Sequence, residues 1–161
     1  MNAYDVLKNH HDVLRGLCQK ISAAPVGTAE RQKYLDELLV ELDIHMRIED
    51  DLYYPAMSAA STLIAIAHAE HRQVVDQLIT LLRTPPAAPE YEDEWESFKT
   101  VLDAHADEEE RDLIPPPPTV KISDEELEVL GNQMSARIAT LRDSTIQKLH
   151  VRGRAALLRA M

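Results

Sequence analysis

Two histidine and carboxylate pairs at helical spacing are the residues of this sequence best suited to chemistry. His45 precedes Glu49 by four residues, and His105 precedes Glu109 by four. Residues at i and i+4 of an α-helix lie one turn apart on the same face, so each pair can reach one ion or two neighbouring ions. Both pairs share a face with regularly spaced apolar residues. A buried ionised carboxylate is costly unless it is paired or binds a metal, so the spacing points to metal binding.

The pairs belong to an internal repeat with an offset of 60 residues. HMRIEDDLYYP at 45–55 and HADEEERDLIP at 105–115 share the pattern H-x-x-x-E-(D/E)-x-x-x-x-P. The segments before them, HHDVLRGL at 10–17 and HRQVVDQL at 71–78, share H-x-x-V-(L/V)-x-x-L. We therefore expect two helix pairs related by an approximate two-fold axis.

The match between residues 10–17 and 71–78 raises the question of which of two adjacent histidines, His10 or His11, points inward. His10 has Val13, Leu14 and Leu17 on its helical face, whereas His11 is turned about 100° away. We therefore predict that His10 points inward and that His11 is exposed.

Each half then supplies one histidine from its first helix and a histidine–glutamate pair from its second. Four imidazoles and two carboxylates are too many for one zinc ion, which usually takes four ligands. They suit two first-row metals bridged by the carboxylates, and the absence of thiolate favours iron or manganese. The predicted ligands are His10, His45, Glu49, His71, His105 and Glu109.

Composition limits the alternatives. The chain has 161 residues, 45% hydrophobic and 28% charged, with only 4 glycines, which predicts one all-α domain. A net charge of −11 argues against nucleic acid and anionic membranes as partners. The single cysteine, Cys18, excludes an internal disulfide, and the N-terminal residues lack the apolar run of a signal peptide, so we expect a cytoplasmic protein.

Breaks in the hydrophobic pattern divide the chain into helices. They fall near 22–30, 58–62 and 84–93, and at the four prolines of 115–118. Ser123 and the acidic residues after it predict the start of a fifth helix that runs to about Arg142, with a short tail from Ser144. We predict an up-down four-helix bundle at residues 1–116 and a C-terminal helical extension at 117–161, packed on the same domain.

These residues carry a resemblance to the hemerythrin-like proteins of the HHE cation-binding family. The pattern H…HxxxE(E/D)xxxxP…H…HxxxE(E/D)xxxxP covers roughly residues 4–116, and the C-terminal helix is similar to one in many bacterial members. The resemblance implies a four-helix bundle around two iron ions, with manganese as the less favoured metal. It also implies two bridging carboxylates and an oxo or hydroxo bridge, and it assigns the six predicted ligands to that centre.

Departures from the oxygen-carrying hemerythrins bear on function. Those proteins have a fifth histidine, where this chain has Ala67. His68 is either a seventh ligand, a partner of a ligand, or a hydrogen-bonded core histidine. Tyr53 and Tyr54 could each ligate iron, donate to a bound peroxide, or only pack at the end of the bundle. Asp50 and Glu110 could accept hydrogen bonds from histidine N–H groups.

Three functions remain open at the level of sequence. The first is a catalase-like oxidoreductase that decomposes hydrogen peroxide in defence against oxidative stress, and this is the reading we favour. The second is a module that binds dioxygen or nitric oxide, or senses iron, without turnover. The third is iron storage, which a single bundle without a mineral cavity disfavours. The partners expected are small molecules, and the chain could be a monomer or a homodimer.

Overall fold

The computed structural model describes residues 1–160, and its regular structure is helical throughout that range. The prediction of an all-α bundle with an additional C-terminal helix is confirmed. In chain order the elements are α1 (Ala3–Ala23), α2 (Ala29–Ile48), a π-helical turn η1 (Glu49–Tyr53), α3 (Tyr54–Ala56), α4 (Ser61–Arg83), α5 (Tyr91–Asp112), α6 (Asp124–Asp143) and α7 (Thr145–Ala160).

Local sequence signals set several of the helix starts. Asn2 and Thr28 cap α1 and α2, because their side-chain oxygens accept from backbone N–H groups of the first turn. Ser123 caps α6 as predicted and forms a capping box with Glu126, in which each side chain bonds the other residue's backbone N–H. These caps satisfy backbone donors that a helix end otherwise leaves unpaired.

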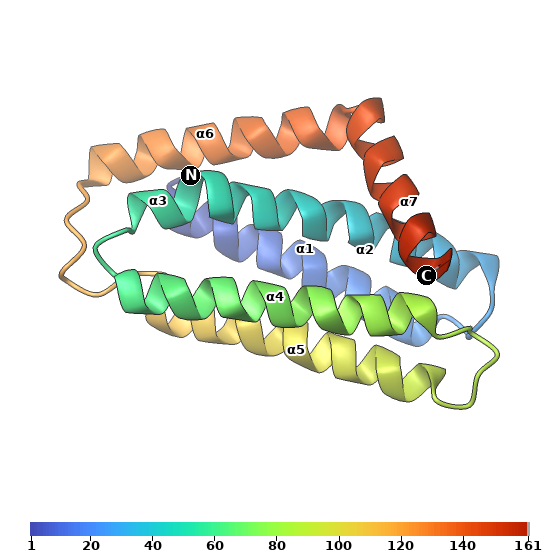
Figure 1. Ribbon diagram of the computed structural model, residues 1–161. Coiled ribbons are helices and arrows are strands. Elements are labelled where there is room, and N and C mark those ends of the chain that lie inside the picture. Colours follow the sequence, from blue (N-terminus) through green and yellow to red (C-terminus); the bar gives the residue numbers. More distant parts are fainter. Residues whose placement is uncertain (161) are drawn as a thin grey trace.

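The four long helices α1, α2, α4 and α5 form the bundle (Figure 1). α1 packs against α2 and α4 against α5, as the repeat predicts. α6 lies across α1 and α2, and the chain then turns so that α7 contacts α4 and α2 (Figure 1). The predicted tail from Ser144 is thus a helix of 16 residues. No helix among residues 1–160 combines the length and the apolar character needed to cross a membrane.

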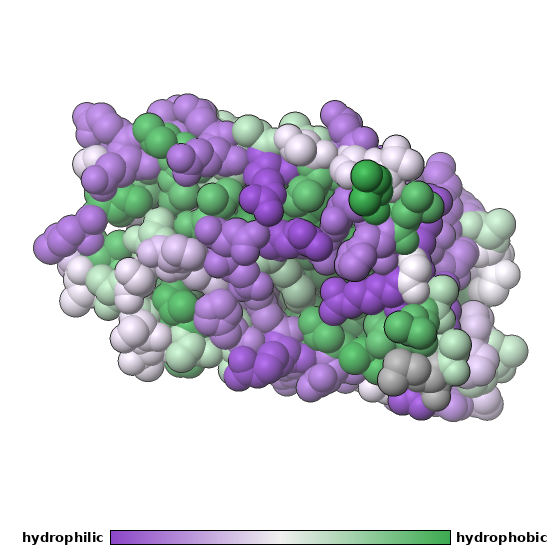
Figure 2. Space-filling model, turned by 45° about the horizontal axis from the view of Figure 1, so that its top comes forward, coloured by the Kyte–Doolittle hydropathy of each residue, from purple (hydrophilic) through white to green (hydrophobic). Residues whose placement is uncertain are grey.

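A glycine allows α6 to lie against the start of the chain. A Cβ atom added at Gly131 would lie 2.4 Å from the carbonyl oxygen of Met1, so a side chain there would displace the helix or the N-terminus. Figure 2 shows this side of the molecule, where polar side chains dominate and hydrophobic ones gather in separate patches. On α7 the exposed hydrophobic residues are Ile146, Leu149 and Leu157.

The core is divided by a layer of polar residues. One apolar cluster lies at the end of the bundle that contains α3 and includes Leu7, Ile48 and Leu113. The other lies towards the opposite end and includes Leu14 and Leu102. Each bundle helix passes from one cluster to the other through a buried histidine. Because isolated buried polar groups cost free energy, this layer must be internally paired or occupied by a ligand.

Candidate metal centre

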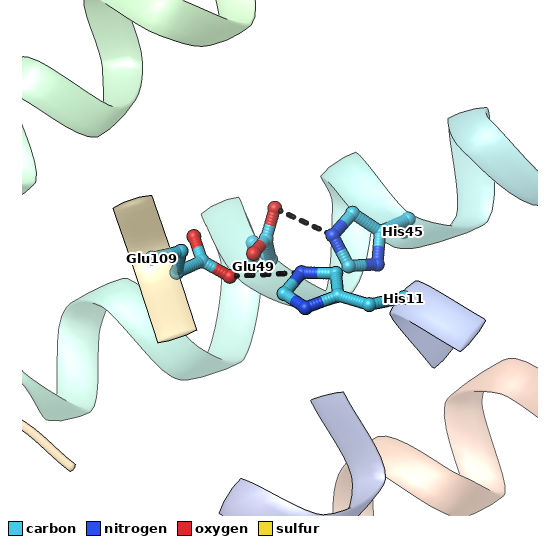
Figure 3. Close-up of side chains that lie close together, drawn as sticks. All are labelled: His11, His45, Glu49 and Glu109. Carbon is cyan, nitrogen blue, oxygen red and sulfur yellow. Dashed lines mark ion pairs between the residues drawn. The ribbon is translucent and has the colours of Figure 1, made fainter. Parts of the chain in front are cut away.

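Four buried side chains from three helices converge in the polar layer (Figure 3). His11 comes from α1, His45 and Glu49 from the end of α2 and the start of η1, and Glu109 from α5. Their side chains are at most 1% exposed. His11 Nε2 lies 3.3 Å from Glu109 Oε1, and His45 Nε2 lies 3.1 Å from Glu49 Oε1. Each residue offers one ligand atom, and these atoms all lie within 4.8 Å of one another.

A second group shares Glu49 with the first. His71 Nε2 of α4 lies 2.9 Å from Glu49 Oε1, and His105 Nε2 of α5 lies 3.6 Å from the same atom. His105 Nε2 also lies 3.6 Å from Glu109 Oε2. The two carboxylates therefore stand between two pairs of histidines. The two groups together form one buried His/Glu cluster that could hold metal.

The hydrogen bonding of the inward-facing atoms is incomplete. His11 Nε2, His45 Nε2, Glu49 Oε2 and Glu109 Oε1 are buried without a hydrogen-bond partner. Buried polar atoms are almost always paired in native proteins, so four orphaned atoms at one place indicate a ligand. All four are nitrogen or oxygen atoms that bind first-row metal ions. The residues present fit a metal centre.

The pKa values show how strongly charge is concentrated here. Burial lowers the pKa of His45 to about 3 and keeps its imidazole neutral. Burial also opposes protonation of His71 and His105, but neighbouring carboxylates raise their pKa values to about 9 and about 11. Burial and the adjacent Glu49 charge raise the pKa of Glu109 to about 7. The pKa of Glu49 is instead lowered, because His45 and other hydrogen-bond partners outweigh the effect of its burial.

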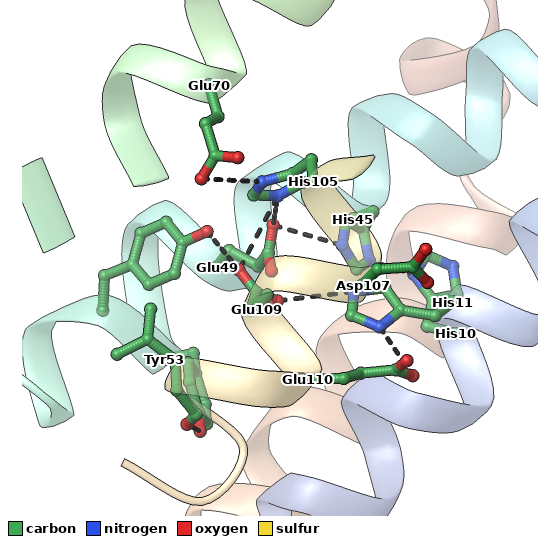
Figure 4. A network of polar contacts seen from close by, with 12 residues as sticks. His10, His11, His45, Glu49, Tyr53, Glu70, His105, Asp107, Glu109 and Glu110 are labelled. Atoms are coloured by element: carbon green, nitrogen blue, oxygen red, sulfur yellow. Dashed lines mark hydrogen bonds and ion pairs between the residues drawn. The ribbon is translucent and has the colours of Figure 1, made fainter. Parts of the chain in front are cut away.

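Three of the four histidines share one orientation, with Nε2 towards Glu49 or Glu109 and Nδ1 towards a second carboxylate. Figure 4 shows two of them, His11 and His105. Such outer carboxylates fix the ring and its tautomer when the histidine binds a metal. Asp50 and Glu110 therefore stand where the sequence placed them as acceptors. The facing pairs are His11 with Glu110 at 3.2 Å, His71 with Asp50 at 3.2 Å and His105 with Glu70 at 3.8 Å.

The structure corrects the choice between the adjacent histidines of α1. His11, predicted to be exposed, is 1% exposed and lies in the cluster, whereas His10 lies in neither group around Glu49. His10 is also buried, with Nδ1 at His45 and Nε2 at Glu41. The physical reason is α6, which covers a second side of α1 near His10. Both histidines are therefore buried, although they point in different directions.

The two tyrosines have different environments. The Tyr54 hydroxyl donates to Glu109 Oε2 at 2.5 Å and lies 3.2 Å from His71 Nε2. The Tyr53 hydroxyl donates to the carbonyl oxygen of Leu113 at 2.5 Å, away from the carboxylate pair. The backbone N–H of Tyr54 bonds to the carbonyl of Glu49, five residues earlier, so the π turn brings Tyr54 round to the side of Glu49.

His68 lies at the edge of the centre. Its side chain is 44% exposed, and its Nδ1 lies 3.4 Å from Asp50 Oδ1. Among residues 1–160, His68 joins a possible metal-binding group with Asp50 and His71, and that group does not include Glu49. Ala67, at the position of the fifth histidine of oxygen carriers, is buried in the apolar cluster.

Two polar neighbours of the centre were missed at the level of sequence. Glu70 faces His105, and Glu41 faces His10. Glu70 lies one residue before His71, and Glu41 lies four residues before His45. The sequence around these two glutamates does not distinguish them from glutamates on the surface. The position of His11, by contrast, had a signal: the 60-residue offset that relates the two histidine–glutamate pairs also places His71 opposite position 11.

Comparison with known proteins agrees with this geometry. A four-helix bundle with histidines and glutamates facing its interior defines a class of metal-binding helical proteins. Residues 2–116 match the family described as Hemerythrin HHE cation binding domain, and the chain belongs to that family. The matched residues contain α1 to α5, so α6 and α7 lie outside them.

Full-length relatives come from mycobacteria. The chain is 63% identical over 161 residues, all of both chains, to Rv2633c of Mycobacterium tuberculosis (strain ATCC 25618 / H37Rv) and to Mb2666c of Mycobacterium bovis, each carrying the name "Uncharacterized protein". A crystal structure of an HHE domain-containing protein from Mycobacterium kansasii, the Rv2633c homolog, is 66% identical. It superimposes with a TM-score of 0.92 over 100% of this chain and 99% of that one. The fold and the C-terminal helices are therefore shared along the whole length.

Proposed function

We propose that this protein is a non-haem di-iron oxidoreductase that decomposes hydrogen peroxide. The observation that carries the proposal is a phenol hydrogen-bonded to a carboxylate of the centre, Tyr54 to Glu109 at 2.5 Å. A protein that only binds a diatomic gas needs no proton source at this position. A protein that converts peroxide to water and dioxygen needs a group there that passes protons on, because the two protons lost by the oxidised peroxide must reach the oxygens released as water.

The proposal assigns the metal ligands to His11, His45, His71, His105, Glu49 and Glu109. His11 replaces His10 in this set, because its Nε2 atom faces Glu109. Nitrogen and oxygen donors without thiolate support iron, with manganese as the alternative. Two bound irons supply a two-electron redox couple, which permits two molecules of hydrogen peroxide to yield two of water and one of dioxygen.

The protein's own groups hold the protons for this reaction. Burial and the charges of Glu49 and Glu109 raise the pKa of Tyr54, so the phenol keeps its proton. Its hydroxyl hydrogen points at Glu109 Oε2, and burial raises the pKa of Glu109 to about 7. Tyr54 therefore holds a proton in a hydrogen bond to Glu109 at the edge of the metal centre.

Surrounding groups orient the ligands and exclude bulk water. Outer carboxylates face three of the histidines, His11, His71 and His105, and the six proposed ligands are buried between two apolar clusters. A dry site strengthens electrostatic interactions among the groups inside it. The buried, unreactive thiol of Cys18, whose pKa burial raises to about 12, is compatible with the cytoplasmic location that we propose.

Oxygen release on addition of hydrogen peroxide tests the proposal directly. Protein with quantified iron is mixed with peroxide in an oxygen electrode while its visible spectrum is recorded. We expect two irons per chain, sustained oxygen release and a spectrum that returns to its starting form. A manganese-loaded sample and a metal-free sample serve as controls. Two irons with a stable new absorption band and no turnover would instead support the binding of dioxygen or nitric oxide.

A further inference from the structure

His45 differs from the other metal-facing histidines in what supports its outer nitrogen. The Nδ1 atoms of His11, His71 and His105 each face a carboxylate. His45 Nδ1 lies 2.8 Å from Nδ1 of another histidine, His10, and their rings are stacked with centroids 5.0 Å apart. An imidazole thus occupies the position where the other three have a carboxylate.

The contacts continue from His10 to the C-terminal part of the chain. His10 Nε2 lies 2.8 Å from Glu41 Oε2. Arg142 of α6 donates to both oxygens of Glu41, from Nε at 2.7 Å and from Nη2 at 2.9 Å. The side chain of His10 is 2% exposed and that of Glu41 13%, whereas that of Arg142 is 44% exposed. The four residues connect the buried centre to the surface.

The chemistry of the atoms fixes the direction of each hydrogen bond. If Nε2 of His45 is to bind a metal, its proton must be on Nδ1, which then donates to Nδ1 of His10. The other nitrogen of His10 must carry the second proton, and it donates to Glu41. Arginine only donates and a carboxylate only accepts, so the last contact runs from Arg142 to Glu41. One assignment of protons satisfies each of the contacts from His45 Nδ1 to Arg142.

We propose that His10, Glu41 and Arg142 are positioning residues that hold His45 in its Nδ1-protonated form and so keep Nε2 free for metal. The inference rests on the metal centre of the proposed function, but it does not depend on the reaction that the centre performs. His10 is then a partner of a metal ligand, and not itself a ligand. The inference also makes α6, which lies beyond the residues that match the family, a part of the metal site.

A pair of arginines on α6 supplies a matched comparison. Arg142 and Arg137 lie on the same helix, with side chains 44% and 39% exposed, and each bonds a carboxylate of the α2–η1 segment. Arg137 bonds Asp51, which faces no histidine in the contacts described, whereas Arg142 bonds Glu41. Arg142→Ala removes two bonds to Glu41, and Arg137→Ala removes one bond to Asp51 from a similarly exposed arginine on the same helix. Only the first contact reaches His45.

Two variants of His10 separate its hydrogen bonding from its packing. His10→Leu fills the space but can neither accept from His45 nor donate to Glu41. His10→Gln retains both abilities, because its amide oxygen accepts and its amide nitrogen donates. Rescue by glutamine but not by leucine is the result expected of a positioning residue.

The first measurement uses metal-free protein and observes the imidazole nitrogens of His45 by ¹⁵N NMR. We expect the Nδ1-protonated tautomer in the wild type, in His10→Gln and in Arg137→Ala. We expect a mixture with the Nε2-protonated tautomer in His10→Leu and, to a smaller extent, in Arg142→Ala. Wild-type spectra in both His10→Leu and Arg142→Ala would overturn the inference.

The second measurement follows the release of iron to a coloured ferrous chelator. Loss of an outer partner of a metal-bound histidine typically lowers metal affinity by about 10- to 100-fold. We expect one of two irons to leave faster by about that factor in His10→Leu, and by about tenfold in Arg142→Ala. Equal release rates for Arg142→Ala and Arg137→Ala would contradict the inference. A wild-type chain that binds iron but does not decompose peroxide would contradict only the proposed function.

Discussion

The two helix pairs present equivalent ligands through different local structures. After Glu49, the second helix of the first pair changes to a π turn and continues into α3, which brings Tyr54 beside the carboxylates. After Glu109, α5 ends within three residues, and no phenol follows. The outer partners also differ, because His45 is held by His10 and its counterpart His105 by Glu70. A repeated motif thus specifies the inward-facing histidines and glutamates, while residues outside the motif give the two sets unequal surroundings.

Of the substitutions considered, removal of the Glu49 carboxylate is expected to have the largest effect on metal binding and stability. Glu49 contacts His45, His71 and His105, whereas Glu109 contacts His11 and His105. Glu49→Ala should abolish the binding of both irons, and with it the stabilisation that bound metal gives, about 4 kcal/mol when metal is present at 1,000 times its dissociation constant. Iron per chain by mass spectrometry and thermal unfolding with and without iron test this. Retention of both irons would refute the role of Glu49 as a bridge.

Exchanging the tyrosine hydroxyls for hydrogen should separate the roles of the two tyrosines that follow Glu49. Tyr54→Phe removes the proton donor at Glu109, and we expect the rate of peroxide decomposition to fall about 100-fold with iron still bound. Tyr53→Phe is the matched control. It loses the bond to the Leu113 carbonyl and should cost about 1 kcal/mol of stability without changing the rate per iron. Equal rates in the two variants would remove Tyr54 from the mechanism.

Acidification should weaken metal binding more through His71 and His105 than through His45. His71 and His105, with pKa values of about 9 and about 11, carry protons at neutral pH in the metal-free protein, whereas His45, at about 3, carries none. Metal binding must release these protons, so affinity falls as the pH falls, by about tenfold per pH unit for each proton released. Calorimetry in buffers of different ionisation enthalpy counts the protons. His71→Gln should release fewer than the wild type, and His45→Gln should release as many.

Much of the fold was predictable because its signals are local. Prolines at 115–118 and the Ser123 cap mark real helix ends, and the spacing of leucines marks the bundle faces. The histidine–glutamate pairs were recognisable because residues four apart share a face of any α-helix. These inferences required no knowledge of how the helices pack.

The position of Tyr54 and the orientations of His10 and His11 could not be predicted from local signals. They depend on a π turn and on a helix packed outside the bundle. In an uninterrupted α-helix Tyr53, four residues after Glu49, shares its face, and the π turn transfers that place to Tyr54. His10 and His11 could not be separated by their apolar neighbours, because α6 buries a second side of α1. The contribution of Arg142 was equally hidden, since 101 residues separate it from Glu41.

The two apolar clusters on either side of the polar layer also determine the direction from which a small molecule can approach. Both ends of the bundle are filled by packed side chains, including Tyr53 and Met57 at one end and Trp95 and Phe98 at the other. A path along the bundle axis is therefore blocked. Asp50 and His68, each more than two-fifths exposed and both close to His71, mark a lateral seam between the π turn and α4. The polar layer is thus exposed at the side of the bundle and covered at its two ends.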